Sequence, residues 1–497
     1  MSVETGSRGG ARVEVQGVSI PTDHYIDGSR VASAERFEVR SPIDWDGWEL
    51  AEMAAGTASE VDEAVAAARR AFPQWAALGT DGRHEVLTRL ADAIDAAVPD
   101  LAQVECVDNG SLREAMRLRV LPRAANNIRF FADFARERLD DPPRLLHGGE
   151  RNRVRYDPAG VVAVSTPWNA PFMLATWRVG PALAAGNTVV LKPPEWAPLT
   201  CSLLGDLADQ AGVPAGVLNI VHGTGASAGA PLTGHPDVDR VAFTGSPTTA
   251  RTVYGDAAGH LTPVSFELGG KSPFIVFEDA NLDAAAATAA YQFDNSGQVC
   301  LAGTRLLVQA SILDDFLARF TARSQEIRVG DPRDAATTYG PLIHPVALER
   351  VTGHVERALA DGARLVFGGR SLGGLYYAPT LFTDIPSGAE ILDHEVFGPV
   401  LTLQTFSDEA EAIELANETS YGLAATIFTG SDSRSDRVSA AVVAGTVWVN
   451  CFYVRDLETP FGGARESGIG REGGRHSFDF YCDVKTVCER TSAFTAS

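Results

Sequence analysis

The stretch Gly160-Val161-Val162-Ala163-Val164-Ser165 opens the part of the chain that decides its fold. It is a short β-branched run, and an Ala-rich stretch with helical spacing follows it. The same pairing of apolar run and helical stretch then repeats. The expected strands are Val161–Val164, Thr188–Leu191, Val217–Val221, Val241–Phe243 and Pro263–Phe266, and the expected helices lie near Leu174–Ala185, Thr200–Ala211, Ala226–Leu232 and Pro247–Ala257. This β-α-β-α alternation predicts an α/β fold with a doubly wound parallel sheet, whose ligands gather beyond the carboxyl ends of the strands.

A second α/β block follows the adjacent glycines Gly269 and Gly270, where a hinge between domains is expected. Its expected strands are Phe274–Phe277, Arg305–Val308, Arg364–Phe367 and Val447–Val449, and its expected helices lie near Leu282–Phe293, Ile312–Ile327, Val346–Ala360 and Asp408–Asn417. Before the first block, the spacing of apolar residues from about Ser59 to Arg138 predicts helices. Two alternating stretches, Arg151–Tyr156 and Ser477–Val487, are predicted to be extended strands that pair with each other.

Composition excludes several classes of protein. The 42 basic and 64 acidic residues give a net charge of −22, which repels nucleic acid. The one basic cluster, between Arg113 and Arg123, is interpreted as a solvated or local anion-binding face of a helix. Six cysteines without a C-x-x-C pair indicate neither a disulfide framework nor a metal site. No secretory signal and no apolar run of about 18 residues is found, so a cytoplasmic protein without membrane contact is expected.

Three residues are candidates for catalysis. Cys300 follows the small and polar approach Asn295–Val299, where a thiol is accessible as a nucleophile, although a lone cysteine is more often a small buried hydrophobe. Glu267 ends an apolar strand, where desolvation raises a carboxyl pKa into the range of a general base; a loop-capping partner of Lys271 is the alternative. Asn169 follows the strand Val161–Val164, where its amide suits either an oxyanion or ordinary turn chemistry.

Three loops are candidates for a dinucleotide. Lys192 and Glu195 stand at a strand end, where they suit ribose hydroxyls, and the acid disfavours a 2′-phosphate, so NAD is favoured over NADP. An ordinary salt bridge is the alternative. Gly245 and Ser246 begin a helix that follows a strand, which suits a pyrophosphate. Gly225 belongs to a looser glycine pattern, which is a weak phosphate motif.

These motifs together resemble the aldehyde dehydrogenase superfamily, over nearly the whole chain from Tyr25 onward. The resemblance rests on Pro167-Trp168-Asn169, Lys192 to Glu195, Glu267-Leu268-Gly269-Gly270-Lys271, Asn295 to Cys300 and Glu395-Val396-Phe397-Gly398-Pro399. It implies that Cys300 is the nucleophile, Glu267 the general base and Asn169 an oxyanion donor beside the Cys300 backbone N–H. It further implies that an acyl thioester forms on Cys300 and that water activated by Glu267 hydrolyses it.

The resemblance also implies a cofactor and a domain plan. Glu395 is expected to hold the nicotinamide ribose of NAD and Phe397 to pack beside the nicotinamide, with Lys192 and Glu195 at the adenosine ribose and Ser246 and Trp168 along the cofactor. An NAD-binding domain is expected over residues 12–137 and 158–267, a catalytic domain over 268–466, and an oligomerisation segment over 138–157 and 467–497. A homo-oligomer, either dimer or tetramer, is therefore expected.

A narrower resemblance concerns the substrate. The stretches Leu121–Ala124, Val454–Gly463 and Gly468–Gly474 look like those of the muconic semialdehyde dehydrogenases. In that branch, arginines at the places of Arg123 and Arg455 hold the carboxylate of the substrate, and Phe461 is expected beside it. Glu458, three residues from Arg455, stands where the branch usually has arginine, so an Arg455–Glu458 ion pair is the alternative role of Arg455.

Other functions are left open at this point. An uncharged aromatic or aliphatic aldehyde would use Phe452, Tyr453 and Trp177 as an apolar lining. Transfer of the acyl group to coenzyme A or phosphate is disfavoured by the presence of Glu267. An NADP enzyme is disfavoured by Glu195, and a catalytically silent relative by the set of Cys300, Glu267 and Asn169.

Overall fold

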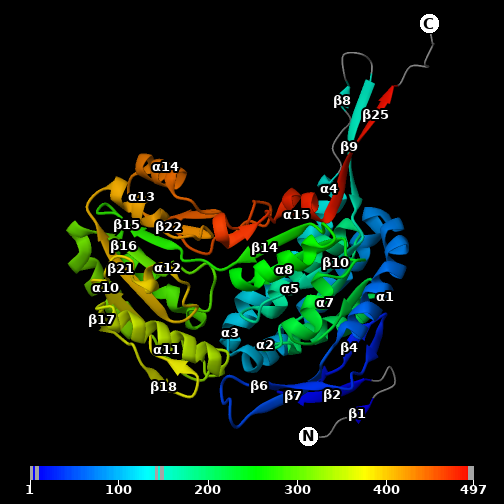
Figure 1. Cartoon of the computed structure of the whole chain (residues 1–497), viewed down its shortest axis with the longest axis horizontal. Helices are drawn as coiled ribbons and strands as arrows, with labels where there is room; N and C mark the ends of the chain where they lie inside the picture. Colours follow the sequence, from blue (N-terminus) through cyan, green and yellow to red (C-terminus); the bar gives the residue numbers. More distant parts are fainter. Residues whose placement is uncertain (1–3, 6–9, 140–143, 146–149, 491–497) are drawn as a thin grey trace.

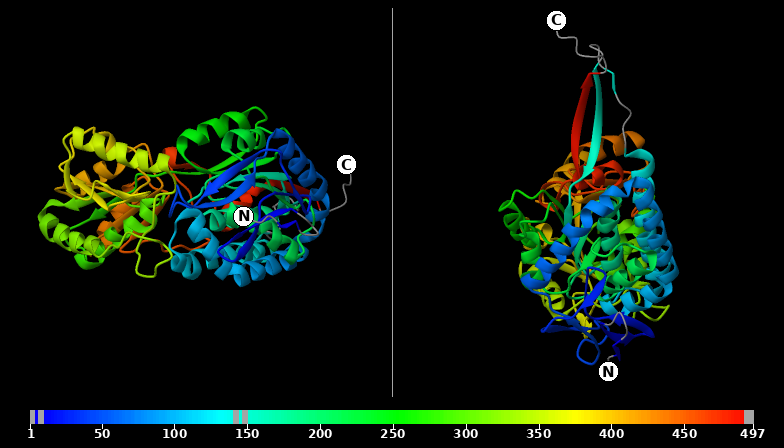
Figure 2. Two further views of the ribbon diagram at one scale, coloured as in Figure 1. Left: turned by 90° about the horizontal axis from the view of Figure 1, so that it is seen from below. Right: turned by 90° about the vertical axis from the view of Figure 1, so that its right-hand side faces the viewer.

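A computed structural model describes residues 4–5, 10–139, 144–145 and 150–490 of the chain. Two lobes lie side by side, and a pair of strands projects from one of them (Figure 1). In Figure 2, the left view shows the two lobes apart and the right view shows the projecting pair.

The lobe that contains most of the first 270 residues is built on an eight-stranded sheet. The strand order is β24-β14-β13-β10-β11-β12-β4-β5, and the five strands from β14 to β12 are parallel. All five strands expected here are confirmed: β10 (Val161–Ser165), β11 (Thr188–Lys192), β12 (Leu218–Ile220), β13 (Arg240–Gly245) and β14 (Val264–Leu268). Glu267 lies inside β14 rather than after it, because pairing with β13 continues to Leu268.

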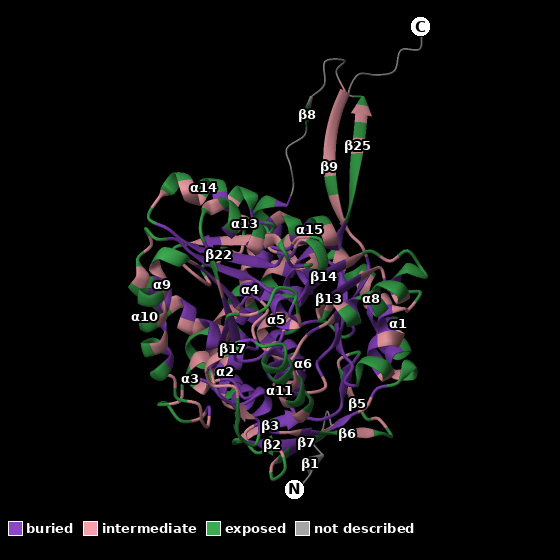
Figure 3. Cartoon of the chain, turned by 60° about the vertical axis from the view of Figure 1, so that its left-hand side comes forward, coloured by how far each residue is buried: buried purple, intermediate pink, exposed green. Residues whose placement is uncertain are grey.

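Alternate side chains of this sheet enter two separate cores, as a sheet covered on both faces requires. Val162 and Val164 pack with the helices α2, α4, α5 and α6, whereas Val161 and Ala163 pack with α1 and α8. The covering helices are α1 (Ala58–Ala77), α2 (Gly79–Asn109), α4 (Leu121–Arg138), α5 (Pro171–Ala185), α6 (Leu199–Ala211) and α8 (Pro247–Ala258). The strands are buried on both faces, while the helices expose their outer surfaces (Figure 3).

Two expected helices differ in detail from the structure. The basic stretch is helical but is not one regular α-helix: α3 (Arg113–Ala115) and α4 are joined by a π-helical turn, η1 (Met116–Val120). The helix expected over Ala226–Leu232 is a π-helical turn, η2 (Gly225–Gly229), continued by the short α7 (Ala230–Thr233). Thr224 caps that turn by accepting a hydrogen bond from the Ser227 N–H, so the helical segment begins at Gly225.

The second lobe contains a seven-stranded sheet with the order β17-β20-β21-β16-β15-β22-β23. Every neighbouring pair is parallel except β17 with β20, at one edge. The four expected strands are confirmed as β15 (Pro273–Val276), β16 (Arg305–Gln309), β17 (Arg364–Phe367) and β23 (Thr446–Val449). Three strands of this sheet were not expected from the sequence: β20 (Thr380–Thr383), β21 (Val400–Phe406) and β22 (Ala424–Phe428).

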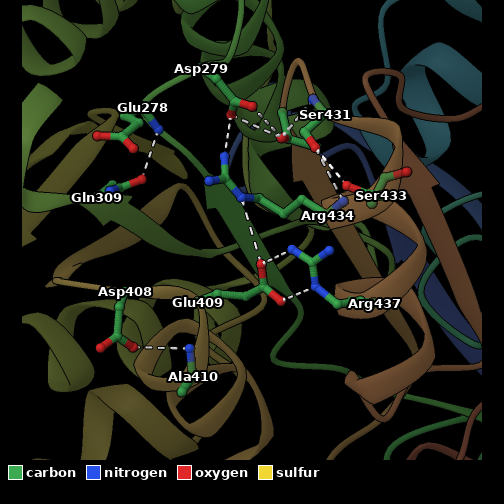
Figure 4. Close-up of polar contacts among 12 residues, drawn as sticks. Glu278, Asp279, Gln309, Asp408, Glu409, Ala410, Ser431, Ser433, Arg434 and Arg437 are labelled. Atoms are coloured by element: carbon green, nitrogen blue, oxygen red, sulfur yellow. Dashed lines mark hydrogen bonds and ion pairs between the residues drawn. The ribbon is translucent and has the colours of Figure 1, made fainter.

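Helices also cover the second sheet. They are α9 (Leu282–Ala290), which continues into the 3-10 segment η3 (Tyr291–Gly297), η4 (Ala310–Ile312), α10 (Leu313–Gln325), α11 (Pro345–Ala360), α12 (Glu390–Asp393), α13 (Glu409–Asn417) and α14 (Asp432–Ala441). A chain of ion pairs joins α13 and α14 to the loop after β15: Arg434 lies 2.6 Å from Asp279, and Glu409 accepts from Arg437 at 2.7 Å (Figure 4). These contacts fasten one outer surface of the second lobe.

The projecting pair consists of β9 (Glu150–Pro158) and β25 (Cys482–Arg490), which pair antiparallel over nine residues (Figure 1). The pairing expected from the sequence is confirmed, but the expectation of a strand from Ser477 is wrong. Gly474–Tyr481 forms α15, which packs against α5, and the strand begins only at Cys482. Phe478 and Tyr481 enter the core of the first lobe from one face of this helix.

The remaining elements lie mainly near the N-terminus. They are β1 (Glu4–Thr5), β2 (Ala11–Val15), β3 (Val18–Pro21), β4 (His24–Ile26), β5 (Ser29–Val31), β6 (Arg36–Arg40), β7 (Glu49–Ala54), β8 (Arg144–Leu145), β18 (Ser371–Gly373), β19 (Tyr376–Tyr377), η5 (Arg465–Ser467) and β24 (Gly468–Ile469). No helix in the described ranges is long and apolar enough to cross a membrane.

The domain limits given above stay predictions, although the chain does pass from one sheet to the other between β14 and β15. Of the expected oligomerisation segment, residues 140–143, 146–149 and 491–497 lie outside the described residues.

Candidate active site

A run of left-handed backbone precedes Cys300. Asn295, Ser296 and Gly297 have φ values of 51°, 58° and 69°. Such a run is costly for Ser296, but its hydroxyl donates to the Gly340 carbonyl at 2.6 Å and so compensates part of that cost. A Cβ on Gly297 would lie 2.2 Å from the Gly398 oxygen, so only glycine fits there. The approach to Cys300 is therefore held in one conformation by the loops it contacts.

The thiol of Cys300 lies close to two carboxylates. Burial raises its pKa to about 12, and the nearby charges of Glu395 and Glu267 contribute to the rise. The backbone N–H groups of Cys300 and Leu301 offset part of it. A thiol with such a pKa is protonated at neutral pH, so it needs a proton acceptor before it can act as a nucleophile.

Glu267 supplies a carboxylate of suitable pKa. It is buried near the carboxyl end of β14, and burial raises its pKa to about 7, against the opposing charges of Arg178, Arg455 and Arg471. Its Oε1 has no hydrogen-bond partner in the described chain. The alternative of a capping glutamate is not supported, because no hydrogen bond or ion pair to Lys271 is found among the described residues. A buried carboxylate with a free oxygen and a pKa near neutrality is suited to exchange protons with a neighbour.

Asn169 lies against the loop that carries Cys300. Its Nδ2 donates to the Gln298 carbonyl at 3.0 Å, and its own carbonyl accepts from Asn295 Nδ2 at 3.4 Å. Because a side-chain amide has two N–H bonds, one donor remains for another acceptor. The structure thus brings Asn169 to the same loop as Cys300, and Glu267 to the surroundings of the thiol.

Beneath Glu267 lies a buried polar network that sequence reasoning missed. Arg178 of α5 is ion-paired with Glu472, and it also donates to Ser265 Oγ at 3.1 Å. Glu472 accepts from Trp177 Nε1 at 2.5 Å and from Ser265 Oγ at 3.1 Å. One sequence signal was available: Arg178 is the one charged residue in the otherwise apolar stretch 171–185. The network contacts β14 at Ser265, two residues before Glu267.

A cavity of about 350 Å³, here called the β13 cavity, opens beyond the ends of β13 and β14. Its lining includes Trp168, Gly245, Ser246, Glu267, Glu395 and Phe397, so five of the eight expected cofactor residues meet there. Ser246 caps α8 by accepting a hydrogen bond from the Thr249 N–H, and Pro247 has no N–H, so the Thr248 N–H is the donor that this helix start can offer to an anion. Glu395 accepts from the Gly270 N–H at 3.1 Å, and a Cβ on Gly269 would lie 2.0 Å from its Oε2. Glycine is thus required where this carboxylate approaches the backbone.

The other three expected cofactor residues do not line the β13 cavity. Lys192 Nζ lies 2.9 Å from Glu195 Oε2, which is the contact that the salt-bridge alternative requires. Gly225 begins η2, and a Cβ placed on it would meet nothing within 4 Å. The Lys192 side chain runs along η2, since its Cδ is 3.9 Å from the Cβ position of Gly229. Lys192, Glu195 and Gly225 therefore belong to one neighbourhood outside the β13 cavity.

A cavity of about 290 Å³, here called the α4 cavity, lies on the other side of Asn169. Its lining includes Met116, Arg119, Arg123, Asn169, Tyr291 and Tyr453. Val299, the neighbour of Cys300, also lines it. The Cys300 loop is thus reached from the α4 cavity, whereas Glu267 and Glu395 face the β13 cavity.

Arg455 is an unusual cation. Its Cζ lies 4.2 Å from the ring centroid of Trp177 and 3.8 Å from that of Phe461, and its buried Nη2 has no partner among the described residues. Burial and the nearby charge of Arg123 lower its pKa to about 10. The guanidinium groups of Arg123 and Arg455 therefore lie close enough to repel each other, and the charge of Glu267 offsets part of this repulsion. An anion that contacts both guanidinium groups would offset more of it.

The alternative role of Arg455 is wrong. Glu458 forms its ion pair with Arg138, at 2.6 Å, and no contact of Glu458 with Arg455 is found in the described chain. Asp456 Oδ1 accepts from the Glu458 N–H, and this turn directs the Glu458 side chain toward the surface. The positive charge of Arg455 is thus not neutralised by Glu458.

Comparison with known proteins agrees with this arrangement. Residues 30–487 match the model of the aldehyde dehydrogenase family. The chain belongs to this family. A 2-hydroxymuconic semialdehyde dehydrogenase of Pseudomonas sp. (strain CF600) is 43% identical over 480 residues, covering 94% of this chain and 98% of the relative. A human 2-aminomuconic semialdehyde dehydrogenase is 39% identical, covering 94% of this chain and 97% of the relative.

Solved structures of aldehyde dehydrogenases have the same fold. An indole-3-acetaldehyde dehydrogenase of P. syringae, solved in complex with NAD+ and IAA, superposes with a TM-score of 0.93 at 38% identity, covering 95% of this chain and 97% of that chain. This aldehyde dehydrogenase is accordingly an oxidoreductase that oxidises an aldehyde with a nicotinamide dinucleotide. No cluster of three or more metal-ligating side chains occurs among the residues that the structure describes.

Proposed function

We propose that this aldehyde dehydrogenase oxidises a carboxylated semialdehyde of the muconic type to the dicarboxylic acid, with NAD as the cofactor. The observation that carries the proposal is the pair Arg455 and Arg123, two cations near enough to repel each other, of which Arg455 has a buried Nη2 without a hydrogen-bond partner among the described residues. An arginine fork binds a carboxylate through two parallel hydrogen bonds. The two muconic semialdehyde dehydrogenases described above add support, because their names place a substrate of this class in the same family branch.

Cys300 is the proposed nucleophile. Its thiol gives its proton to the Glu267 carboxylate, whose pKa of about 7 allows it to accept one. The sulfur then attacks the aldehyde carbon, and the carbonyl π electrons move to the oxygen, which becomes an oxyanion. The free N–H of the Asn169 amide and the Cys300 backbone N–H are the proposed donors to that oxyanion. One such donor is typically worth about 3 kcal/mol in the barrier.

The residues that line the β13 cavity fit the nicotinamide end of a dinucleotide. Glu395 presents a carboxylate to ribose hydroxyls, Phe397 and Trp168 offer ring faces, and the start of α8 suits the pyrophosphate. When bound, NAD supplies the hydride acceptor of the reaction. Lys192 and Glu195 are proposed to hold the adenosine ribose, and the negative charge of Glu195 disfavours a 2′-phosphate.

Glu267 is proposed to complete the turnover. After oxidation, the acyl group is bound to Cys300 as a thioester. Glu267 first releases to solvent the proton that it took from the thiol. It then removes a proton from a water molecule, whose oxygen attacks the thioester carbon while the Cys300 sulfur leaves. The released sulfur takes up a proton, and the product leaves as a carboxylic acid. Acyl transfer to coenzyme A or phosphate needs no such base, so the position of Glu267 favours hydrolysis.

An uncharged aromatic aldehyde is the second candidate substrate. The solved indole-3-acetaldehyde dehydrogenase acts, by its name, on an aldehyde without a carboxylate. Of the three aromatic residues expected to line an apolar tunnel, Tyr453 does line the α4 cavity, whereas Phe452 packs on Trp448 and Trp177 under Arg455. Only one of the three therefore supports an apolar tunnel directly.

A direct assay tests the proposal. The purified chain is given 2-hydroxymuconic semialdehyde or benzaldehyde, with NAD or NADP, and the reduced cofactor is followed by its absorbance. We expect the highest kcat/KM with the semialdehyde and NAD, and no turnover by Cys300→Ala, which should still bind NAD. Equal kcat/KM for the two aldehydes would refute the proposal that the substrate is a carboxylated semialdehyde. Glu195→Gln should lower the ratio of kcat/KM with NAD to kcat/KM with NADP. An unchanged ratio would refute the proposal that Glu195 disfavours the 2′-phosphate of NADP.

The projecting strands β9 and β25 are proposed to join subunits of a homo-oligomer. Both strands extend beyond the lobe (Figure 1), and the short β8 pairs with the other edge of β9. No strand in the described ranges pairs with the outer edge of β25, so a second chain could cover that edge. Sedimentation analysis of the full chain beside a chain ending at Tyr481 tests this. We expect the shortened chain to sediment as a monomer. The same number of subunits in the oligomers of both chains would refute the proposal.

A further inference from the structure

A second cavity adjoins the α4 cavity and has no place in the mechanism above. It measures about 480 Å³ and is here called the α10 cavity. Much of its lining is apolar and includes Ala287, Ala290, Phe293, Ile327 and Tyr339. Four residues line both cavities: Leu112, Arg119, Tyr291 and Asp294. These four are called the ridge, because side chains that belong to two adjoining cavities are the wall between them.

Tyr291 is the aromatic residue of the ridge, and it is held on two sides. Its ring meets Phe452 and Tyr453 edge-to-face, with centroids 6.2 and 6.5 Å away. Its hydroxyl accepts a hydrogen bond from Arg119 Nη1. A ring held by both packing and a charge-assisted hydrogen bond has little freedom to turn aside for a ligand.

Arg119 is in turn held by the segment that leads to Cys300. Its Nη2 lies 3.7 Å from Asp294 Oδ2, and its guanidinium lies over the Tyr291 ring, 5.7 Å from the centroid. Asp294 immediately precedes the left-handed run Asn295–Gly297. Arg119 comes from the π-helical turn η1, an irregularity that is frequent at functional sites. The ridge therefore joins η1 to the backbone that positions the nucleophile.

We infer that Tyr291 determines which aldehydes the α4 cavity accepts, by closing it against the α10 cavity. A compact aldehyde fits the α4 cavity as it stands. An aldehyde with a second fused ring would need the space that the Tyr291 side chain occupies. Arg119 and Asp294 are positioning residues that hold Tyr291 in place. The inference rests on the proposed function only in taking the α4 cavity as the place of the aldehyde.

Two pairs of aldehydes measure this selectivity. The first pair, 4-formylbenzoate and 6-formyl-2-naphthoate, carries a carboxylate, and the second pair, benzaldehyde and 2-naphthaldehyde, does not. Within each pair the larger member differs by one fused ring. The measured quantity is the ratio of kcat/KM for the larger aldehyde to that for the smaller one, with the dinucleotide that the native chain prefers. If the proposed carboxylate binding by Arg123 and Arg455 is wrong, kcat/KM will be low for both carboxylated aldehydes. The ratio within the uncharged pair would still test the role of Tyr291.

Tyr291→Ala is expected to raise this ratio by about tenfold or more in both pairs, since a filled or vacant site of ring size discriminates at least that strongly. Tyr291→Phe keeps the ring and should leave the ratio within about threefold of the native value. Ile327→Ala is the matched control, because it enlarges the α10 cavity without touching the ridge, and it should leave the ratio unchanged. If Tyr291→Ala does not fold, as judged by its melting curve, Tyr291→Leu replaces it. An unchanged ratio in a folded variant would overturn the inference.

Arg119→Ala tests the positioning role. It should raise the ratio in the uncharged pair, in the same direction as Tyr291→Ala but by less, through KM rather than kcat. The uncharged pair is decisive here, because loss of a positive charge alone does not change the relative binding of two neutral aldehydes. Arg117→Ala is the control: Arg117 belongs to the same turn but pairs with Glu114 and lines neither cavity. Equal effects of the two arginine variants would overturn the role of Arg119.

Discussion

The guanidinium of Arg455 is stacked on the ring of Phe461, with 3.8 Å between its Cζ and the ring centroid. The ring of Trp177 lies 4.2 Å from the same atom. Contacts with aromatic faces stabilise the cation without using its N–H donors. Arg455 therefore keeps a free, buried donor, Nη2, while its side chain is held in position.

Replacing Arg455 should affect carboxylated substrates selectively. Arg455→Ala is expected to lower kcat/KM for 2-hydroxymuconic semialdehyde by about 10- to 100-fold, because a hydrogen bond to a charged group is worth about 1.5–3 kcal/mol. The value for benzaldehyde should change by less than about threefold. Initial rates with both aldehydes check this. Glu458→Gln is the control, since Glu458 pairs with Arg138 and not with Arg455. Equal losses for both aldehydes would show that Arg455 is structural.

Replacing Glu267 should separate the two halves of the reaction. Glu267→Gln removes the base for thioester hydrolysis and the acceptor of the Cys300 thiol proton. A rapid-mixing experiment should therefore show about one reduced cofactor formed per active site, more slowly than in the native chain, and then a turnover slower than the native turnover by about 10²- to 10⁴-fold. Asp283→Asn, which removes an exposed acid from a helix start, is the control and should behave as the native chain. A first phase as fast as in the native chain would contradict the role of Glu267 as the proton acceptor for Cys300, and an unchanged turnover would contradict its role in hydrolysis.

The pH dependence follows from the raised pKa of Glu267. Burial raises that pKa to about 7, so the carboxylate that acts as a base predominates only above this pH. Turnover should therefore fall about tenfold per pH unit below 7 and reach a plateau above it. Arg455 lowers the pKa of Glu267, so Arg455→Ala should shift the fall to higher pH. Profiles of kcat from pH 5.5 to 9 test this prediction. A flat profile in the native chain would contradict the role of Glu267 as the general base.

Breaking the pair Arg178–Glu472 should destabilise the fold. Glu472→Gln leaves Arg178 buried without its carboxylate, and removing one partner of a buried ion pair typically costs about 3–5 kcal/mol. Urea unfolding measures the free energy of unfolding. Arg437→Ala is the control, because Arg437 is an exposed residue of the ion-pair chain in Figure 4 and such pairs contribute less than about 1 kcal/mol. Similar losses in the two variants would mean that the buried network does not stabilise β14.

The sequence was sufficient to predict the five parallel strands of the first lobe, because buried parallel strands are short apolar runs, but not the antiparallel strands β4, β5 and β24 at the edges of the same sheet. It failed for β20, which is only Thr380–Thr383 and has threonines at both ends, so that pairing with β21 rather than apolar pattern defines it. Ser477–Tyr481 alternates as a strand would, but tertiary contacts of Phe478 made it helical.

The site was predictable where motifs are local and unpredictable where partners are distant. Cys300, Glu267 and Asn169 stand in recognisable local contexts. The contact of Arg178 with Glu472 joins residues 294 positions apart in the chain, and no local pattern announces it. The ion pair of Glu458 with Arg138 likewise joins residues that are distant in the chain, and for that reason the sequence leaves an Arg455–Glu458 pair open as an alternative.

The left-handed run before Cys300 restricts how this enzyme can be made more robust. At Ser296 a residue free to adopt positive φ would relieve an unfavourable backbone, yet it would also remove the hydroxyl that ties the run to Gly340. A substitution at Ser296 that lowers the backbone strain would therefore also loosen the loop that positions Cys300. Attempts to raise heat tolerance will succeed sooner on the outer helices than in these three residues.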